Sequence, residues 1–121
     1  ISPWRQGRLH QGLRKELLMS SDLFLELRDK SGRLINTLGE LGKLGREYAL
    51  AEQHYRVELA KEIMKLRVEG IPVTIINDLA KGNENIARLK TQRDIAETMY
   101  KKQTEAINVY KLEIKIIILV V

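Results

Sequence analysis

Few residues of this chain are of the types that carry out catalysis or bind metal, and those few are poorly placed for it. The two histidines are His10 and His54, and neither belongs to an HxxxH or HExxH pattern. A zinc site on a helix needs two histidines one turn apart. The chain contains no cysteine, which excludes thiolate ligands, thiolate nucleophiles and disulfides. The sequence therefore predicts no metal site, and we interpret His54 as a residue at the edge of a helix face.

The hydroxyl and carboxylate residues offer no better catalytic arrangement. Ser20, Ser21 and Ser31 lack the G-x-S-x-G context of a nucleophile elbow. Glu58 and Glu62 stand one helical turn apart, but exposed helices carry such pairs routinely, and no glutamate has the histidine three residues on that di-iron bundles need. We predict that the protein is not an enzyme and uses no cofactor.

The elements that would have to position any site are helices. The 121 residues are 31% charged and only 5% aromatic, and Leu, Ile, Ala, Glu, Lys and Arg dominate. This composition is typical of long helices and coiled coils. A single helix pair buries little surface, so association would help to stabilise it. We predict an all-α fold: a long antiparallel helical hairpin or coiled coil, completed by association into an oligomeric helical bundle.

The boundaries of these helices follow from breaking and capping residues. We expect a single helical domain over 19–121, with helices at about 21–30 and 34–69, a corner at 70–74, a short helix at 75–81 and a long helix at about 83–119. Ser31-Gly32 is a turn signal, Gly70 suits a left-handed C-terminal position, and Pro72 cannot continue a helix. Thr74 is the expected cap of the restart, and Asn83 that of the last helix.

The strongest signal is an apolar seam in the second half. Counting from Leu79 in alternating steps of three and four reaches Val121, with only Gly82, Arg93 and Gln103 as non-apolar exceptions. A heptad phase held this long indicates a coiled-coil seam, in which the two polar side chains could fix register or partner number. A helical spacing from Tyr48 to Leu66 supplies the facing seam. The predicted interface residues are Tyr48, Tyr55, Leu59, Leu66, Ile86, Leu89, Tyr100, Ile107, Tyr110 and Ile114.

Two local features have more than one interpretation. Gly39, Gly42 and Gly45 either weaken the helix that contains them or allow a close helix crossing. The run "EGIPVTIINDLAKGNENIARLK" at 69–90 is either a corner with a short helical step or a helix-turn-helix that reads DNA. The corner is favoured, because Ala80 stands too close to Gly82 for the familiar motif.

Charge leaves nucleic-acid binding open as an alternative. The net charge is +5, but residues 1–15 hold four basic and no acidic side chains, so the rest of the chain is nearly neutral. The candidate nucleic-acid contacts are Arg88, Lys90, Arg93, Lys101 and Lys102. Acidic residues interleave with them, which favours a solvated face, and phosphate binding would have to weaken steeply with salt.

Both ends differ from the remainder. Residues 1–18 form a basic, weakly periodic segment that is either native or foreign to the natural chain, and Met19 resembles a natural start. Residues 116–121 are six apolar residues in a row, which either pack under another helix or form an altered tail. No apolar run approaches the roughly 20 residues that span a bilayer, so we expect no membrane partner.

Residues 38–115 resemble small, mostly uncharacterised coiled-coil proteins encoded by phages and prophages of Gram-positive bacteria. The residues that carry the resemblance are Tyr48-Ala49, the EGIPVT corner at 69–74 and the DLAKGN-ENIARL restart at 78–89. The resemblance implies an accessory role in the cytoplasm of a bacterial host cell, and it supplies no functional residue.

These observations together predict a non-enzymatic structural or interaction module. Its apolar seam would bind further copies of the chain or a helix of a protein partner. The alternative is a nucleic-acid-binding accessory protein in phage replication or recombination.

Overall fold

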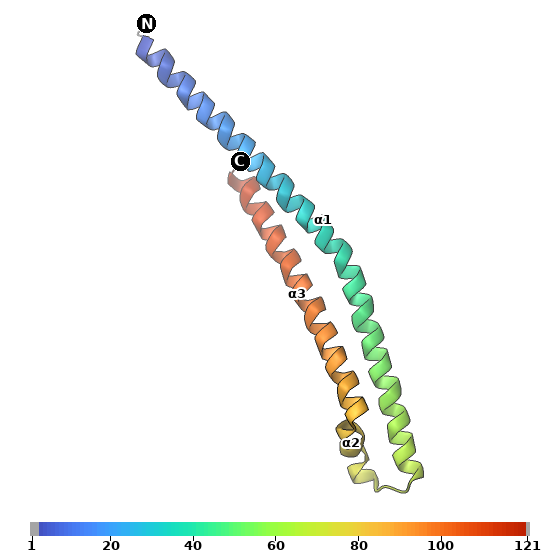
Figure 1. The fold of residues 1–121 in the computed structure, drawn as a ribbon. Coiled ribbons are helices and arrows are strands. Elements are labelled where there is room, and N and C mark those ends of the chain that lie inside the picture. The colour runs from blue at the N-terminus through green and yellow to red at the C-terminus, as the bar shows by residue number, and fades with distance from the viewer. Residues whose placement is uncertain (1–2, 121) are drawn as a thin grey trace. The chain divides into compact units, whose positions relative to one another are not determined.

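The computed structural model describes residues 3–120, including the side chains of residues 12–16 and 19–120. Over this range the chain forms three helices and no strand: α1 (Pro3–Val68), α2 (Val73–Gly82) and α3 (Glu84–Val120) (Figure 1). The prediction of an all-α fold is confirmed.

The chain divides into two compact units. The first combines residues 1–38 with 106–121, and the second comprises residues 39–105. The single helical domain expected over 19–121 stays a prediction. Contacts between two paired helices are local along their length, so contacts in a long pair can fall into separate groups. Each unit is described by itself below.

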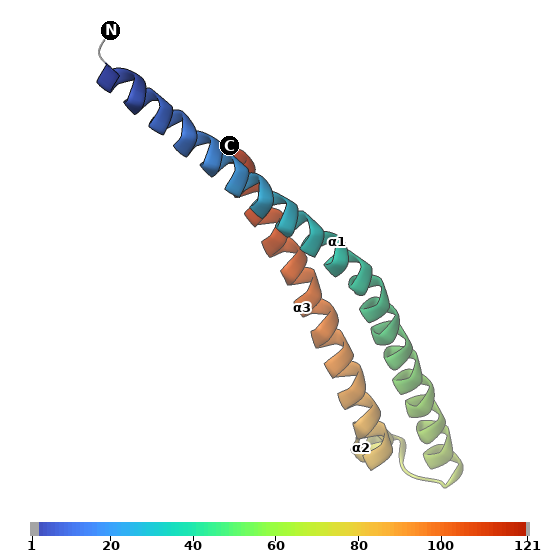
Figure 2. The same cartoon turned by 45° about the horizontal axis from the view of Figure 1, so that its top comes forward.

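Residues 39–105 form an antiparallel helical hairpin. In both views the first part of α3 runs beside the last part of α1, and α2 lies at the closed end (Figure 1, Figure 2). Tyr55, Ile86 and Leu89 form a buried cluster, against which Leu59 packs. Aliphatic side chains of α1 and α3 thus close this hairpin within one chain.

The closed end begins with a glycine-dependent stop of α1. Gly70 has a φ of +82°, the left-handed conformation that glycine adopts most easily. The Gly70 N–H donates to the Arg67 carbonyl at 3.1 Å, and the Ile71 N–H donates to the Leu66 carbonyl at 3.1 Å. This pair of bonds is the Schellman motif, which satisfies carbonyls at the helix end. The expected role of Gly70 is confirmed.

The restart after the corner differs from the prediction at one residue. Pro72 occupies the cap position of α2 and no side chain caps the helix, so Thr74 is not the cap. Proline suits this place because its missing N–H is not needed in a first turn. Ile76 and Ala80, one turn apart, are the buried residues of α2. Seam position Leu79 therefore falls on the exposed side, since α2 is a separate helix.

Asn83 joins α2 to α3 and caps α3, as predicted. Its Oδ1 accepts hydrogen bonds from the backbone N–H of Asn85 at 2.9 Å and of Ile86 at 3.3 Å. A side-chain oxygen in this position satisfies two donors that a helix start leaves open. Only this one residue separates α2 from α3, so the longer turn of a helix-turn-helix is missing here. The segment 69–90 is a corner with a short helical step.

The other unit pairs the described part of residues 1–38 with the last part of α3. Leu23, Leu27, Lys30, Leu34 and Thr37 are half-buried and follow steps of four, three, four and three. On α3, Ile107 and Ile117 are buried and Tyr110 and Ile114 are half-buried. The half-buried residues of this stretch of α1 therefore follow the same heptad spacing as the seam residues of α3.

One prediction about the first helix is wrong. The helix does not break at 29–33, because α1 is continuous through Ser31 and Gly32. A single glycine costs about 1 kcal/mol in a helix, which the packing of Leu27 and Leu34 on either side can offset. The described part of the basic segment 1–18 is helical, because α1 begins at Pro3. Proline is tolerated in a first helical turn.

The apolar end of the chain packs only in part. Ile117 is buried, whereas Ile116, Ile118, Leu119 and Val120 are exposed. Val120 lines a shallow groove with Glu16, Met19, Ser20 and Leu23 of α1. Val121, the last predicted seam position, lies outside the described residues.

Candidate interaction surfaces

The ten predicted interface residues all lie on the inner faces of helices within one chain. Tyr55, Ile86, Leu89 and Ile107 are buried. The others are half-buried, namely Tyr48, Leu59, Leu66, Tyr100, Tyr110 and Ile114. The seam therefore closes α1 against α3 in each unit. A second copy could reach these side chains only if the helices of one chain separated, so a surface for another molecule has to be sought elsewhere.

Two tyrosines form the aromatic part of the seam in residues 39–105. The rings of Tyr48 and Tyr100 are 6.1 Å apart between centroids and inclined by 40°. A Cβ added to Gly45 would lie 3.4 Å from the Tyr100 ring, whereas one added to Gly39 or Gly42 would meet nothing within 4 Å. The 3.4 Å distance is an ordinary contact with a side-chain ring, so none of the three glycines lies at a close approach of two backbones.

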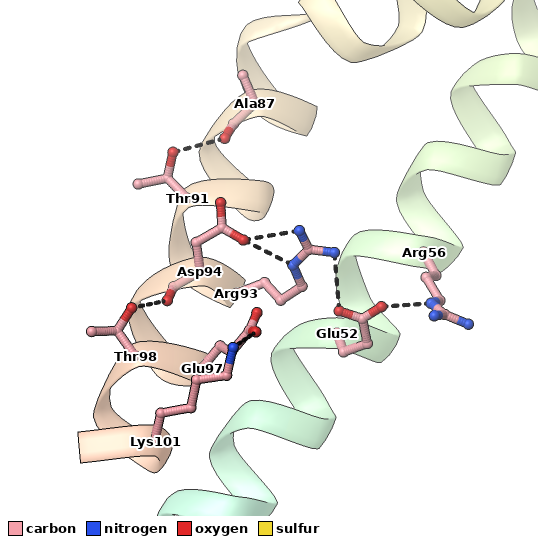
Figure 3. Close-up of polar contacts among 9 residues, drawn as sticks. All are labelled: Glu52, Arg56, Ala87, Thr91, Arg93, Asp94, Glu97, Thr98 and Lys101. Atoms are coloured by element: carbon pink, nitrogen blue, oxygen red, sulfur yellow. Dashed lines mark hydrogen bonds and ion pairs between the residues drawn. The ribbon is translucent and has the colours of Figure 1, made fainter. Parts of the chain in front are cut away.

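Arg93 is the polar residue at the centre of this seam. Its Nη1 lies 3.2 Å from Glu52 Oε2 on α1, and its Nη2 lies 2.9 Å from Asp94 Oδ1 (Figure 3). The guanidinium carbon also sits 4.9 Å from the centre of the Tyr55 ring, a cation–π contact. Arg93 thus joins α3 to α1 through an ion pair with Glu52 and a cation–π contact with Tyr55. These contacts fix the register of the hairpin within one chain.

The other polar seam residues are paired in the same manner. Gln103 Nε2 donates to Glu40 Oε2 at 3.0 Å in residues 39–105. In the other unit, Lys30 Nζ lies 2.7 Å from Glu113 Oε2. Each pair joins α1 to α3. Because a shift of one residue would separate the members, these pairs select one register among those that the apolar residues would allow.

Hydrogen bonding shifts the titration of these pairs. The hydrogen bond from Arg56, followed by the one from Arg93, lowers the pKa of the Glu52 carboxyl from its ordinary value. The hydrogen bond to Glu113 raises the pKa of Lys30. Both shifts favour the charged forms that make the ion pairs.

The five candidate nucleic-acid contacts do not gather into one basic patch of free side chains. Arg93 is held by Glu52 and Asp94. Lys101 Nζ lies 2.7 Å from Glu97 Oε1, also drawn in Figure 3, and Arg88 Nη2 donates to Asn85 Oδ1 at 2.6 Å. Lys90 and Lys102 are exposed on α3. The role of these residues in nucleic-acid binding stays a prediction.

Large apolar side chains that point outward were missed by the seam prediction. In residues 39–105 they include Leu50, Val57 and Met64 on α1 and Ile95 and Met99 on α3. In the other unit, Phe24 is 62% exposed, and Ile35, Val109 and Leu112 are also exposed. The signal that could have revealed three of them is the seven-residue spacing of Leu50, Val57 and Met64. Polar residues occupy the positions between them on the same row of the helix, and they hide this pattern.

The described residues offer little for other kinds of site. Over these residues, no group of three or more histidine, cysteine, aspartate or glutamate side chains is placed to hold a metal ion. A groove on the hairpin is lined by Glu40, Lys43, Leu44, Glu47, Met99 and Gln103. It brings residues of α1 and α3 to one side of the molecule and includes no histidine, serine or threonine. None of the helices, over the range described, combines the length and apolar character that crossing a membrane requires.

Comparison of the chain with protein-family models, with curated proteins and with solved structures finds no match in any of the three.

Proposed function

We propose that the protein is a non-enzymatic structural module that associates with further copies of itself through the outward apolar faces of its helices. The observation that carries the proposal is the number of large aliphatic side chains left outside a seam that is already closed. Leu50, Val57 and Met64 are 64%, 44% and 63% exposed. Single exposed apolar residues are ordinary, but apolar residues in a row along a helix mark surfaces that bind another molecule.

This proposal moves the interface from the seam to the outer faces. The seam residues satisfy one another within a chain, whereas Leu50, Val57, Ile95 and Met99 have no such cover. Burial of apolar surface contributes about 25 cal/mol per Å², so covering these side chains would stabilise an assembly. The helices hold the exposed residues at fixed spacing, which suits recognition of another helix.

A bacterial-cytoplasmic, phage-associated accessory role fits this kind of module. Its support is the resemblance of residues 38–115 to phage-encoded coiled-coil proteins, carried by the corner at 69–74 and the restart at 78–89. Small accessory proteins without a reactive site act by holding other components together. The helix of a protein partner could occupy the same outer faces.

Thermal unfolding at several protein concentrations tests the proposal. Association of folded chains stabilises them by mass action, so the midpoint of the helix signal in circular dichroism should rise over a roughly hundredfold increase in concentration. Repeated scans should superimpose, which shows that the transition is reversible. A midpoint that stays constant over this range would refute self-association.

A further inference from the structure

A second row of residues runs along the exposed side of α1, within residues 39–105. Its positions alternate in steps of four and three: Lys43, Glu47, Leu50, His54, Val57, Lys61, Met64 and Val68. We call these residues the outer row. All eight are exposed. At 100° per residue the outer row occupies a strip roughly 100° wide, and its apolar members Leu50, Val57 and Met64 lie roughly 140–180° around the helix from Tyr55 of the seam. A strip with this spacing has the geometry of a helix-packing face.

The outer row combines an apolar line with a definite arrangement of charge. Leu50, Val57 and Met64 repeat every seven residues and form the apolar line. Beside it, Glu47 and Lys61 stand seven residues before and seven residues after His54. Glu47 and Lys61 therefore carry opposite charges at equal distances from His54, and Lys43 adds a second basic residue beyond Glu47. Such an arrangement is complementary to its own reverse.

We propose that the outer row is the interface of an antiparallel homodimer, with a two-fold axis near His54. In this register Glu47 faces Lys61 of the partner subunit, and the symmetry repeats the pair. Within one chain Lys61 Nζ lies 3.3 Å from Glu58 Oε1, so the contact with Glu47 would add a second carboxylate to this ammonium group. Leu50 faces Val57 of the partner subunit, and Lys43 lies along Met64 of the partner subunit, where its methylene stem can cover the thioether. An isologous contact uses the same surface twice and closes on itself. This inference rests on the proposed self-association and specifies its geometry.

A parallel arrangement of the same row is less favourable. It would align Leu50, Val57 and Met64 with their own copies, but it would also place Glu47 beside Glu47 of the partner subunit and Lys61 beside Lys61 of the partner subunit. Like charges on packed helices are destabilising by amounts similar to the gain from opposite charges. Charge therefore selects the antiparallel orientation.

Met99 of α3 borders the same side of the hairpin, because it lines one groove with Lys43 and Glu47.

Single-cysteine variants test this register directly, because the chain has no cysteine of its own. His54→Cys places the thiol next to the two-fold axis, and Lys43→Cys is its matched control on the same exposed row. In the antiparallel dimer, the two copies of position 43 are about 33 Å apart along the helix, at 1.5 Å per residue. A short bismaleimide should therefore link H54C into a covalent dimer and leave K43C largely unlinked.

Charge exchange gives a second, independent readout. Glu47→Lys or Lys61→Glu alone should weaken dimerisation roughly tenfold at low salt, because each change creates two like-charge contacts. The double variant should recover most of the wild-type affinity. Glu47 is exposed, so the helix content of Glu47→Lys should match that of the wild type. Lys61→Glu also removes the ion pair with Glu58, so its helix content has to be measured beside its affinity.

The outcomes separate the inference from the proposal on which it rests. Efficient linking of H54C with little linking of K43C, together with rescue in the charge-exchange variant, supports the antiparallel outer-row dimer. Equal linking of both variants would show a parallel pair and overturn the inference. Linking of neither variant, in a chain whose sedimentation mass is dimeric, would overturn the inference and leave self-association standing. A monomeric mass for the wild type would overturn both.

Discussion

Arg93 shows how one polar side chain can define a helical hairpin whose apolar residues are nearly interchangeable. It contacts Glu52, Asp94 and the Tyr55 ring at once, from a seam position that an aliphatic residue would normally occupy. Leucine and isoleucine side chains pack at several registers, but this set of contacts exists at one. The stabilisation from a partly exposed pair is small, so we assign Arg93 mainly to specificity of register.

The Glu52 carboxylate makes this contact sensitive to acid. Its pKa is lowered in the folded chain from the ordinary value of 4.5 by hydrogen bonds from Arg56 and Arg93. A lowered pKa contributes stability that is present above the unfolded value and is lost as the pH falls through the folded value. Glu52→Gln should therefore lose less unfolding free energy than the wild type between about pH 5 and pH 3, as urea titrations would measure. Equal losses in the two proteins would contradict the assignment.

Gly70 and Gly42 should respond to alanine in opposite directions. Gly70 has a φ of +82°, where an L side chain is strained, so Gly70→Ala should destabilise the fold by about 1 kcal/mol. Gly42 lies inside α1 with nothing within 4 Å of an added Cβ, so Gly42→Ala should stabilise it by up to about 1 kcal/mol. Urea unfolding of the two variants makes the comparison. Destabilisation by both would show that Gly42 meets something in solution.

At the scale of the element, the second half of the chain was predictable because its pattern is nearly complete. Apolar residues hold the heptad phase from Ile86 to Ile117, and Asn83 gives a clear start to α3. The corner could be predicted as well, since Gly70 and Pro72 both stop a helix. These signals are local, so they can be recognised without any knowledge of the partner helix.

The first half was harder to predict because polar residues occupy its inner positions. Lys30 and Thr37 lie on the half-buried face of α1, and Glu58 and Glu62 do so further along, so the hydrophobic pattern alone hides the repeat. Lys30 belongs there because Glu113, far away in sequence, pairs with it. The outer row was missed for the same reason, since half of its positions are charged or histidine. Pairing across helices cannot be recognised from one helix alone.

The seam of α3 can be tested with two neighbouring positions. Ile107 is 4% exposed and Val109 is 51% exposed on the same helix. Ile107→Asp places an unpaired carboxylate among apolar side chains and should lower the unfolding free energy by more than about 3 kcal/mol. Val109→Asp, the matched control, should change the stability by about 0.5 kcal/mol or less in the free chain. Circular dichroism and urea unfolding measure both. If I107D keeps wild-type helicity and stability, the seam assignment is wrong.

In the whole molecule, large apolar side chains lie in two kinds of place. Seam residues such as Tyr55, Ile86 and Ile107 close the helices of one chain. Outward residues such as Leu50, Val57 and Met64 remain available to another molecule. In the proposed function, one face of each helix stabilises the chain and another face binds a further copy. The proposed self-association gives the exposed aliphatic side chains of the described residues a role.

Sedimentation equilibrium of the wild-type chain at neutral pH measures its mass in solution and so tests whether folded chains associate with one another. The single chain has a mass of 14.0 kDa. We predict a weight-average mass that rises with concentration to at least twice this value and persists at high salt, because apolar contacts are not screened. A mass of 14.0 kDa at every concentration would contradict the claim.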